Sequence, residues 1–313
     1  MPDWRILITD GLNESGQAIL SVSAQVEDRP NITAEELVLA VSEFDALVVR
    51  GRTKVTAAVF DAATRLKVVG RAGVGVDNID LNAAKAHGVA VVNAPQSTSL
   101  AVAELTMALM LGLARSLPRA DAALKAGKWI KKELEGIELN GKVLGLIGVG
   151  NIGSLVANRA AAFGMTVLGY DPLLSGEQIR SRQAEPVSLD EIYSRADFIS
   201  LHVPLIAETR GMIGEQALGK MKPGVRLICA ARGGVIDEAA LLKSLESGHV
   251  AGAALDVFSK EPPGQIDLLA HPNVVGTPHI GAQTEEAQGR ASIDIATEVL
   301  AALRGEPLRW RVA

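Results

Sequence analysis

The chain has 313 residues, enough for about two domains, and 48% of them are hydrophobic. Because only 3% are aromatic, the cores are expected to be aliphatic, as in parallel sheets covered by helices. The net charge of −5, with both signs interspersed along the chain, excludes the basic footprint of a protein that binds nucleic acid.

Three sequence features predict where in the cell the protein is located. Residues 1–5 lack a basic segment followed by an apolar run, so no signal peptide is expected. The most apolar helical pattern, near residues 100–114, contains Glu104 and is too short to span a bilayer. The only cysteine, Cys229, lies in an apolar run and is expected to be a core residue rather than a nucleophile. We therefore expect a cytoplasmic protein without a membrane partner.

Short apolar runs alternate with helical patterns in the first hundred residues, which is typical of βαβ units with a parallel sheet. Thr33 and Glu36 have capping-box spacing in front of one of these helices. The expected strands are residues 6–9, 46–49, 67–70 and 89–92.

A long helix over residues 100–117 is expected next, and the domain boundary is placed before it, after Pro95. A second series of apolar runs follows, with capping-box spacing at Ser188 and Glu191. Its expected strands are residues 143–147, 166–170, 198–201, 225–229, 251–255 and 274–276.

The last helical pattern, residues 285–303, has apolar residues every fourth position and therefore one buried stripe. The stripe consists of Ala287, Ala291, Ile295 and Val299. This pattern alone does not indicate which domain receives it. The alternation along the chain predicts the α/β fold class with doubly wound parallel sheets in two Rossmann-like domains.

Residues 142–153, KVLGLIGVGNIG, form an apolar strand that runs into a glycine-rich turn opening a helix. Gly148 permits the tight turn, Gly150 lets backbone N–H groups approach a pyrophosphate, and Gly153 lets the helix pack on the strand. Asp171 follows the next strand, where its carboxylate would bind a ribose diol and repel a 2′-phosphate. No basic residue follows it immediately. The cofactor predicted by this pattern is NAD rather than NADP.

In an open parallel sheet, the carboxyl ends of the strands line one crevice, so residues that follow the second series can converge near a nicotinamide. Arg232 offers a planar, permanently charged donor for a carboxylate. His279 is an acid/base that works near neutral pH, and Glu261 can orient it. This combination suits the oxidation of a 2-hydroxy acid. Taken singly, each is also an ordinary loop residue, and His202 is expected to be structural.

Several motifs, in this order along the chain, resemble the D-isomer-specific 2-hydroxyacid dehydrogenase family: GRAGVGVDNID at 70–80, GVGNIG, AARGGVIDE, ALDVFSKEPP and TPHIGAQTEEA. The similarity covers almost the whole chain. It implies that His279 is the acid/base, Glu261 its partner and Arg232 the anchor of the substrate carboxylate and carbonyl. Besides the three glycines, it implies cofactor contacts from Val74, Asn151, Ile152, Asp171, Val203, Ala230, Ala231, Asp256, Gly281 and Ala282.

The resemblance also implies an inserted NAD-binding Rossmann domain, residues 98–282, and a discontinuous flavodoxin-like substrate domain, residues 1–97 and 283–313. The family is usually dimeric through the inserted domain and the arm around residues 101–140, so a homodimer, or a tetramer built on it, is expected. The chain ends without the serine-binding regulatory domain of long members, and feedback through such a domain is not expected. It departs from the family at Cys229, where Asn is common, at Gln283, where Ser is usual, and at Thr98, where an Asn often helps to bind the substrate.

Arginines at the strand ends of the first domain suit an anionic substrate. Lys131 resembles a basic position that reaches a neighbouring subunit's site. Ordinary solvated arginines are the alternative reading. The predicted substrate-binding residues are Arg50, Arg52, Arg71, Gly73, Val74 and Thr98. The arginines favour a substrate with an anionic tail, and together with the resemblance they imply 3-phosphoglycerate, oxidised to 3-phosphohydroxypyruvate in the first step of phosphorylated serine biosynthesis.

Two other functions stay open. One is a related dehydrogenase acting on glyoxylate or unphosphorylated hydroxypyruvate. The other belongs to a different class, an NAD(H)-sensing corepressor that binds partners through its substrate domain. Absence of turnover with any 2-oxo acid, together with NADH-dependent partner binding, would support the corepressor. No metal site is expected.

Overall fold

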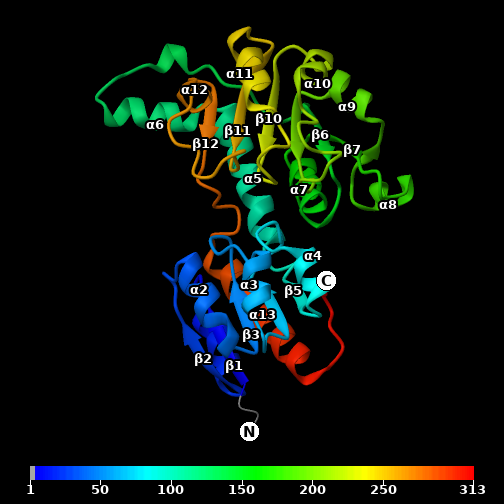
Figure 1. Ribbon diagram of the computed structural model, residues 1–313. Coiled ribbons are helices and arrows are strands. Elements are labelled where there is room, and N and C mark those ends of the chain that lie inside the picture. The colour runs from blue at the N-terminus through cyan, green and yellow to red at the C-terminus, as the bar shows by residue number, and fades with distance from the viewer. Residues whose placement is uncertain (1–3) are drawn as a thin grey trace. The chain divides into compact units, whose positions relative to one another are not determined.

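A computed structural model describes residues 4–313, so the first three residues of the expected N-terminal domain lie outside it. The chain forms two compact units (Figure 1). The first unit contains the chain up to Ser99 together with Ala282–Ala313, and the second is Leu100–Gly281.

The first unit is built on a five-stranded parallel sheet of order β2-β1-β3-β4-β5. This is the flavodoxin-like order, in which the strand order reverses between β1 and β3. The strands are β1 (Trp4–Ile8), β2 (Ala24–Asp28), β3 (Ala46–Val49), β4 (Val68–Arg71) and β5 (Ala90–Asn93).

One strand of this sheet, β2, was not predicted. Its sequence, AQVED, is largely polar, and none of its residues is fully buried because it lies at the sheet edge. An edge strand buries too little surface to require an apolar run, so the pattern gives little signal.

Helices cover both faces of the first sheet. The predicted capping box forms at Thr33 and Glu36. The predicted stripe of the C-terminal helix, α13, is confirmed, because Ala287, Ala291 and Ile295 are buried, as is Val299, and the helix packs on β4 and β5. The helices are α1 (Glu14–Ser21), α2 (Ala34–Ala40), η1 (Val41–Glu43), α3 (Ala57–Ala62), α4 (Leu81–Ala86) and α13 (Glu285–Arg304).

The second unit is built on a seven-stranded parallel sheet of order β12-β11-β10-β9-β6-β7-β8. The two-residue edge strand β8 was not predicted, and the other six were, within one residue. Together the two sheets confirm the predicted α/β fold class with doubly wound parallel sheets. The strands are β6 (Val143–Ile147), β7 (Thr166–Tyr170), β8 (Glu185–Pro186), β9 (Phe198–Leu201), β10 (Val225–Cys229), β11 (Val250–Leu255) and β12 (Val274–Gly276).

The helix predicted over residues 100–117 ends earlier than expected. Helix α5 (Ser99–Ala114) stops before Ser116, which has a left-handed φ of 50°. Pro118 then lies in the first turn of a new helix, α6 (Leu117–Lys125), a position where its missing N–H costs nothing. The chain therefore bends where apolar periodicity alone suggested continuity.

The remaining helices of the second unit pack on the two faces of its sheet, and the predicted capping box forms at Ser188 and Glu191. These helices are η2 (Lys131–Glu133), α7 (Asn151–Ala162), α8 (Gly176–Ser181), α9 (Leu189–Arg195), α10 (Glu215–Lys220), α11 (Glu238–Glu246) and α12 (Asp267–Ala270).

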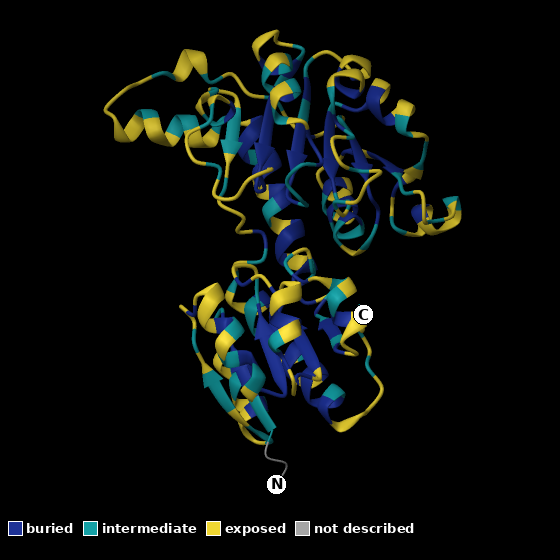
Figure 2. Ribbon diagram, in the orientation of Figure 1, coloured by how far each residue is buried: buried dark blue, intermediate teal, exposed yellow. Residues whose placement is uncertain are grey.

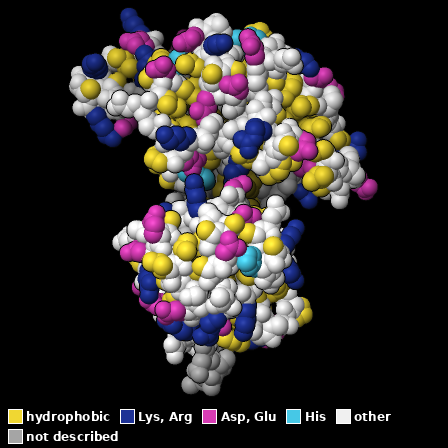
Figure 3. All heavy atoms as spheres, in the orientation of Figure 1, with side chains coloured by type: hydrophobic (Ala, Val, Ile, Leu, Met, Phe, Trp, Pro, Cys, Tyr) yellow, Lys and Arg dark blue, Asp and Glu magenta, His cyan; other side chains and the backbone are white. Residues whose placement is uncertain are grey.

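The buried residues follow the sheets, with apolar clusters on both faces of each (Figure 2). The cores are aliphatic as predicted, with few aromatic residues among them. Acidic and basic side chains are interspersed over the visible surface of each unit (Figure 3). Within residues 4–313, no single helix has the length and apolar character to cross a membrane; α5 and α6, bent by 65°, meet that test as a pair by length and composition only.

Candidate active site

Close packing explains two glycines of the turn that joins β6 to α7. Gly148 has a φ of 93°, and a Cβ there would lie 2.5 Å from the carbonyl oxygen of His202. A Cβ on Gly153 would lie 2.2 Å from the carbonyl oxygen of Gly148. The turn can therefore approach β9 and α7 only because both residues lack a side chain.

The third glycine has a different reason to be there. Gly150 is the N-cap of α7, which has no side-chain cap, and a Cβ on Gly150 would meet nothing within 4 Å. The protein's own packing does not require glycine at this position. An open space in front of uncapped N–H groups at a helix N-terminus fits a pyrophosphate, so the residues present suit a dinucleotide.

Replacing Gly150 with alanine tests this reading. The Kd for NADH is expected to rise by about tenfold or more, because the methyl group would fill the phosphate space. The free energy of unfolding should change by less than about 1 kcal/mol. The matched control is Gly219→Ala in α10, where a Cβ also meets nothing. Titrations of protein fluorescence with NADH measure the Kd of each variant. Equal affinities in Gly150→Ala and Gly219→Ala would contradict the assignment.

Asp171 lies beside the same turn. Its carboxylate accepts hydrogen bonds from the backbone N–H groups of Val149 and Leu173, both at 3.0 Å. Sequence reasoning missed Arg182, which follows α8 and donates from Nη1 to the carbonyl oxygen of Val149. An arginine thus reaches the turn through the fold although none follows Asp171 directly. The signal was absent because the contact spans more than thirty positions.

His202 is half-buried behind the glycine turn, at the end of β9. Its Nε2 lies 2.9 Å from Oγ of Ser200, and its Nδ1 is buried without a hydrogen-bond partner among the described residues. Burial lowers the pKa of His202 to about 4, so the ring is neutral at pH 7. The expectation that this histidine is structural fits these contacts.

This lowered pKa predicts acid sensitivity. Between pH 6.5 and about 4 the unfolded chain binds a proton at His202 that the folded chain does not, so the free energy of unfolding falls as the pH is lowered through this window. The total loss is about 3 kcal/mol at about 1.4 kcal/mol per pKa unit. In His202→Gln this component should vanish, giving a flatter dependence in urea denaturation between about pH 7 and about pH 4.5. Parallel curves for the two proteins would contradict the prediction.

The two residues predicted as the acid/base and its partner lie in contact. His279 Nδ1 lies 2.7 Å from Oε2 of Glu261, and Oε1 of Glu261 accepts a hydrogen bond from the backbone N–H of Phe258 at 3.1 Å. The two side chains are 49% and 37% exposed, so solutes can reach them. With Nδ1 held by the carboxylate, Nε2 is the nitrogen available for proton transfer.

A buried carboxylate fixes the loop that carries His279. Asp256, fully buried after β11, accepts hydrogen bonds from Thr277 Oγ1 at 2.6 Å and from the backbone N–H groups of Ile280 and Gly281, both at 2.8 Å. His279 itself has a left-handed φ of 53°. Asp256 was predicted as a cofactor contact, and the structure shows that its oxygens hold the histidine loop.

Arg232 lies in the loop after β10, beside β11 in the sheet. Its Nη1 donates to the carbonyl oxygen of Ala231 at 2.7 Å. A Cβ on Gly233 would lie 1.8 Å from the carbonyl oxygen of Phe258, so this loop packs tightly against the loop that leads to Glu261. The catalytic candidates thus follow three neighbouring strands, β10, β11 and β12, at one edge of the sheet.

Cys229 is a core residue, as predicted. It is 2% exposed, and burial raises the pKa of its thiol to about 11, which keeps it protonated.

The other predicted cofactor residues fall in both units. Asn151 and Ile152 begin α7, Val203 follows β9, and Ala230 and Ala231 follow β10. Gly281 is the last residue of the second unit, whereas Val74 and Ala282 belong to the first. Their contacts with a cofactor stay predictions.

The predicted substrate residues belong to the first unit, at the carboxyl ends of neighbouring strands. Arg50 and Arg52 follow β3, and Arg71 is the last residue of β4. A Cβ on Gly73 would lie 1.5 Å from Nη1 of Arg71, so glycine there leaves room for the guanidinium. Thr98 is buried, 4% exposed.

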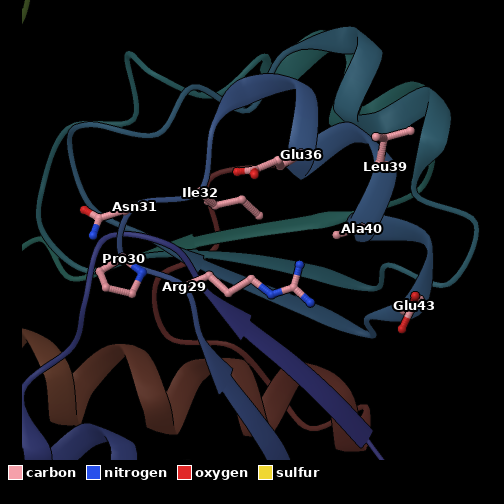
Figure 4. Close-up of a pocket in the computed structure, with 8 residues that line it drawn as sticks. All are labelled: Arg29, Pro30, Asn31, Ile32, Glu36, Leu39, Ala40 and Glu43. Carbon is pink, nitrogen blue, oxygen red and sulfur yellow. The ribbon is translucent and has the colours of Figure 1, made fainter.

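A pocket of about 490 Å³ opens elsewhere on the first unit, between the end of β2 and helix α2 (Figure 4). Its lining has no residue in common with the predicted site. It is lined by Arg29, Pro30, Asn31, Ile32, Glu36, Leu39, Ala40 and Glu43. Within residues 4–313, no cluster of three or more His, Cys, Asp or Glu side chains could hold a metal ion.

The fold and the glycine turn define a dinucleotide-binding protein of the doubly wound α/β class. Residues 107–281 match the family model for the NAD-binding domain of D-isomer specific 2-hydroxyacid dehydrogenases. The chain belongs to this family, and its second unit carries the NAD-binding domain, with NAD as the cofactor.

Known proteins similar to the chain agree with this assignment. It is 50% identical over 303 residues to D-3-phosphoglycerate dehydrogenase of Methanocaldococcus jannaschii, covering 96% of this chain and 58% of that protein. It is 47% identical over 305 residues to the Rattus norvegicus protein of the same name, covering 97% and 57%. The chain thus spans a little under three fifths of these curated relatives.

Solved structures are similar over the whole chain. A glyoxylate reductase from Paecilomyes thermophila is 33% identical with a TM-score of 0.90, covering 100% of this chain and 99% of that one. D-lactate dehydrogenase from Escherichia coli, in its apo-structure, is 26% identical with a TM-score of 0.87, covering 99% and 100%.

Proposed function

We propose that the chain catalyses the NAD-dependent oxidation of D-3-phosphoglycerate to 3-phosphohydroxypyruvate, and the reverse reduction. The observation that carries the reaction type is the 2.7 Å contact between His279 Nδ1 and Glu261 Oε2 in an NAD-binding unit. An imidazole held in this way can exchange the proton of a substrate hydroxyl while a hydride leaves the same carbon.

Each of the three residues has a separate task in this proposal. Arg232 binds the carboxylate beside the reacting carbon with two parallel hydrogen bonds. Glu261 accepts a hydrogen bond from the Nδ1–H of His279 and stabilises the imidazolium that forms when Nε2 takes the hydroxyl proton. The chemistry that bound NAD would supply is a hydride acceptor, C4 of the nicotinamide. In reduction the same proton returns from Nε2 to the carbonyl oxygen.

The phosphate distinguishes this substrate from smaller 2-hydroxy acids. Arg50 and Arg71 lie at the ends of neighbouring strands in the first unit, where positive charge suits an anionic substrate. Relatives that are 44–50% identical carry the name D-3-phosphoglycerate dehydrogenase, which supports the same substrate here. This reaction would supply phosphorylated serine biosynthesis.

A substrate panel with NADH tests the proposal. We expect a higher kcat/KM for 3-phosphohydroxypyruvate than for hydroxypyruvate or glyoxylate, by about tenfold or more, since a well-placed charged contact contributes at least about 1.5 kcal/mol. Preference for glyoxylate or hydroxypyruvate would reject the phosphate assignment and favour the related reductase. Loss of turnover with all 2-oxo acids would reject the enzyme.

We further propose that the protein is a homodimer formed through the second unit. Helix α6 has no buried residue, and it projects with the following segment from the body of its unit (Figure 1). Leu117, Leu124 and Trp129 are exposed along this arm, and Trp129 is 81% exposed. Apolar side chains exposed on a projecting helix and on the segment after it are typical of an interface. Sedimentation analysis of the wild type and Leu124→Asp tests it, and a monomeric wild type would reject it.

A further inference from the structure

A buried carboxylate that the sequence did not single out holds the loop carrying two of the predicted substrate arginines. Asp10 lies just after β1, and its side chain is only 5% exposed. Oδ2 accepts hydrogen bonds from the backbone N–H groups of Arg50, at 2.7 Å, and Thr53, at 3.1 Å. Oδ1 accepts a third from Thr53 Oγ1 at 2.5 Å. One side chain thus fixes both ends of the loop Arg50–Thr53.

The same loop is held from its other side by Asn78. Its Nδ2 donates to the carbonyl oxygen of Arg50 at 3.0 Å and to that of Thr53 at 2.6 Å. Both the N–H and the C=O of Arg50 and of Thr53 are therefore bonded before any ligand arrives. A loop fixed in advance loses less conformational entropy when it binds, and this strengthens binding.

The two arginines of the loop have different surroundings. The guanidinium of Arg52 bonds to other groups of the protein. Its Nη2 lies 3.1 Å from Asp10 Oδ1 and donates to the carbonyl oxygen of Thr9 at 2.5 Å. Its Nη1 donates to the carbonyl oxygen of Ile32 at 3.1 Å. The carboxylate of Asp10 compensates this charge. Arg52 therefore offers a ligand little net attraction.

Arg50 is bonded to a neutral partner instead. Its Nη2 donates to Oε1 of Gln283 at 2.9 Å. Burial lowers the pKa of the Arg50 guanidinium, and the charge of Asp10 only partly opposes this effect. A partly desolvated cation interacts more strongly with an incoming anion than a fully hydrated one does. Position 283 is also one of the three departures from the family pattern, with glutamine in place of the usual serine.

We propose that Asp10 is a positioning residue: it fixes the loop Arg50–Thr53 and neutralises Arg52, so that Arg50, oriented by Gln283, is the loop's ligand for the phosphate of the substrate. The proposal deepens the proposed function and rests on it for the identity of the substrate. Arg50 and Arg52, which looked equivalent at a strand end, receive separate roles.

The test compares two substrates in Asp10→Ala with NADH. The KM for 3-phosphohydroxypyruvate should rise by about tenfold, because the guanidinium loses its fixed support. The KM for hydroxypyruvate, which has no phosphate, should change by less than about twofold. Asp10→Asn should recover most of the loss, since an amide oxygen can still accept the two backbone N–H bonds. Equal changes for both substrates in Asp10→Ala would overturn the proposal.

Asp45→Ala is the matched control in the same unit. Asp45 is also buried, accepts the backbone N–H of Arg5 at 3.0 Å and pairs with Arg65 at 3.1 Å. Asp45 precedes β3, however, and so lies at the amino ends of the strands, whereas Asp10 lies at their carboxyl ends. Both Asp10→Ala and Asp45→Ala are expected to lower the melting temperature, because each removes a buried carboxylate. Asp45→Ala should leave the ratio of the two KM values unchanged. A ratio altered to the same extent in Asp45→Ala would assign the effect to general destabilisation.

Gln283→Glu supplies a variant that does not depend on folding, because Gln283 is exposed. The new carboxylate should pair with Arg50 and compete with phosphate, raising the KM for the phosphorylated substrate by about tenfold. Inorganic phosphate provides a readout without turnover. It should raise the melting temperature of the wild type and of Asp45→Ala, and not of Asp10→Ala or Gln283→Glu.

These readouts separate the two levels of the proposal. If phosphate stabilises the wild type but the wild type does not reduce 3-phosphohydroxypyruvate, the proposed function is wrong. The role of Asp10 in holding a phosphate-binding loop is still supported by that result. A wild type that is not stabilised by phosphate overturns the role of Asp10, as does stabilisation that persists in both Asp10→Ala and Gln283→Glu.

Discussion

Replacing His279 with asparagine is expected to lower kcat/KM for the 2-oxo acid substrate by about 10³-fold, within the range of a lost general acid/base. Asparagine removes Nε2, the nitrogen left available once Nδ1 is held by Glu261. It also tolerates the left-handed backbone that His279 adopts at a φ of 53°. The loop held by Asp256 should therefore keep its shape, and steady-state kinetics with NADH would measure the chemistry alone.

Two measurements show whether the loss is chemical. The Kd for NADH and the melting temperature of His279→Asn should match those of the wild type. Glu261→Gln should lose less activity, about 10²-fold, because its amide oxygen can still orient the ring while the charge that stabilises the imidazolium is gone. If His279→Asn kept more than about a tenth of the activity, another group would have to transfer the proton.

The sequence predicted the fold wherever burial dictates the residue type. The central strands β3, β6 and β9 are almost entirely apolar because helices cover both faces of the sheets, and their bounds were predicted to the residue. Strands β2 and β8 were missed because edge strands bury little. The long helix was predicted about three residues too long, because it ends before the left-handed Ser116 and a new helix begins at Leu117.

The candidate site was predictable where its residues directly follow predicted strands. His279, Glu261 and Arg232 follow neighbouring strands, and the fold brings the first two into contact. Two residues that hold other parts of the predicted site, Asp10 and Arg182, were not predicted, because their contacts join distant parts of the chain. Asp10 bonds to residues forty or more positions away, and Arg182 reaches the glycine turn across thirty-three.

The two units use the same device at their strand ends. In the first, Asp10 follows β1 and accepts the N–H groups of the loop that presents Arg50. In the second, Asp256 follows β11 and accepts those of the loop that presents His279. In both, a buried carboxylate satisfied by backbone donors sets a loop whose side chain remains available for ligand. Substitution of either carboxylate should therefore affect function through the loop.

Arg232→Lys is the second change with a large expected effect, a loss of about 10²-fold in kcat/KM. Lysine keeps the charge but offers a single point donor, so the two parallel hydrogen bonds to the substrate carboxylate are lost, at a cost of about 3 kcal/mol. Arg226→Lys is the control: Arg226 lies in β10 of the same unit and its guanidinium packs over Phe198 at 5.7 Å. Comparable losses in both variants would indicate a general need for arginine in this part of the sheet. A loss confined to Arg232→Lys, with NADH affinity unchanged, would identify Arg232 as the group that holds the reacting acid, because the one difference between the variants would then be the carboxylate contact.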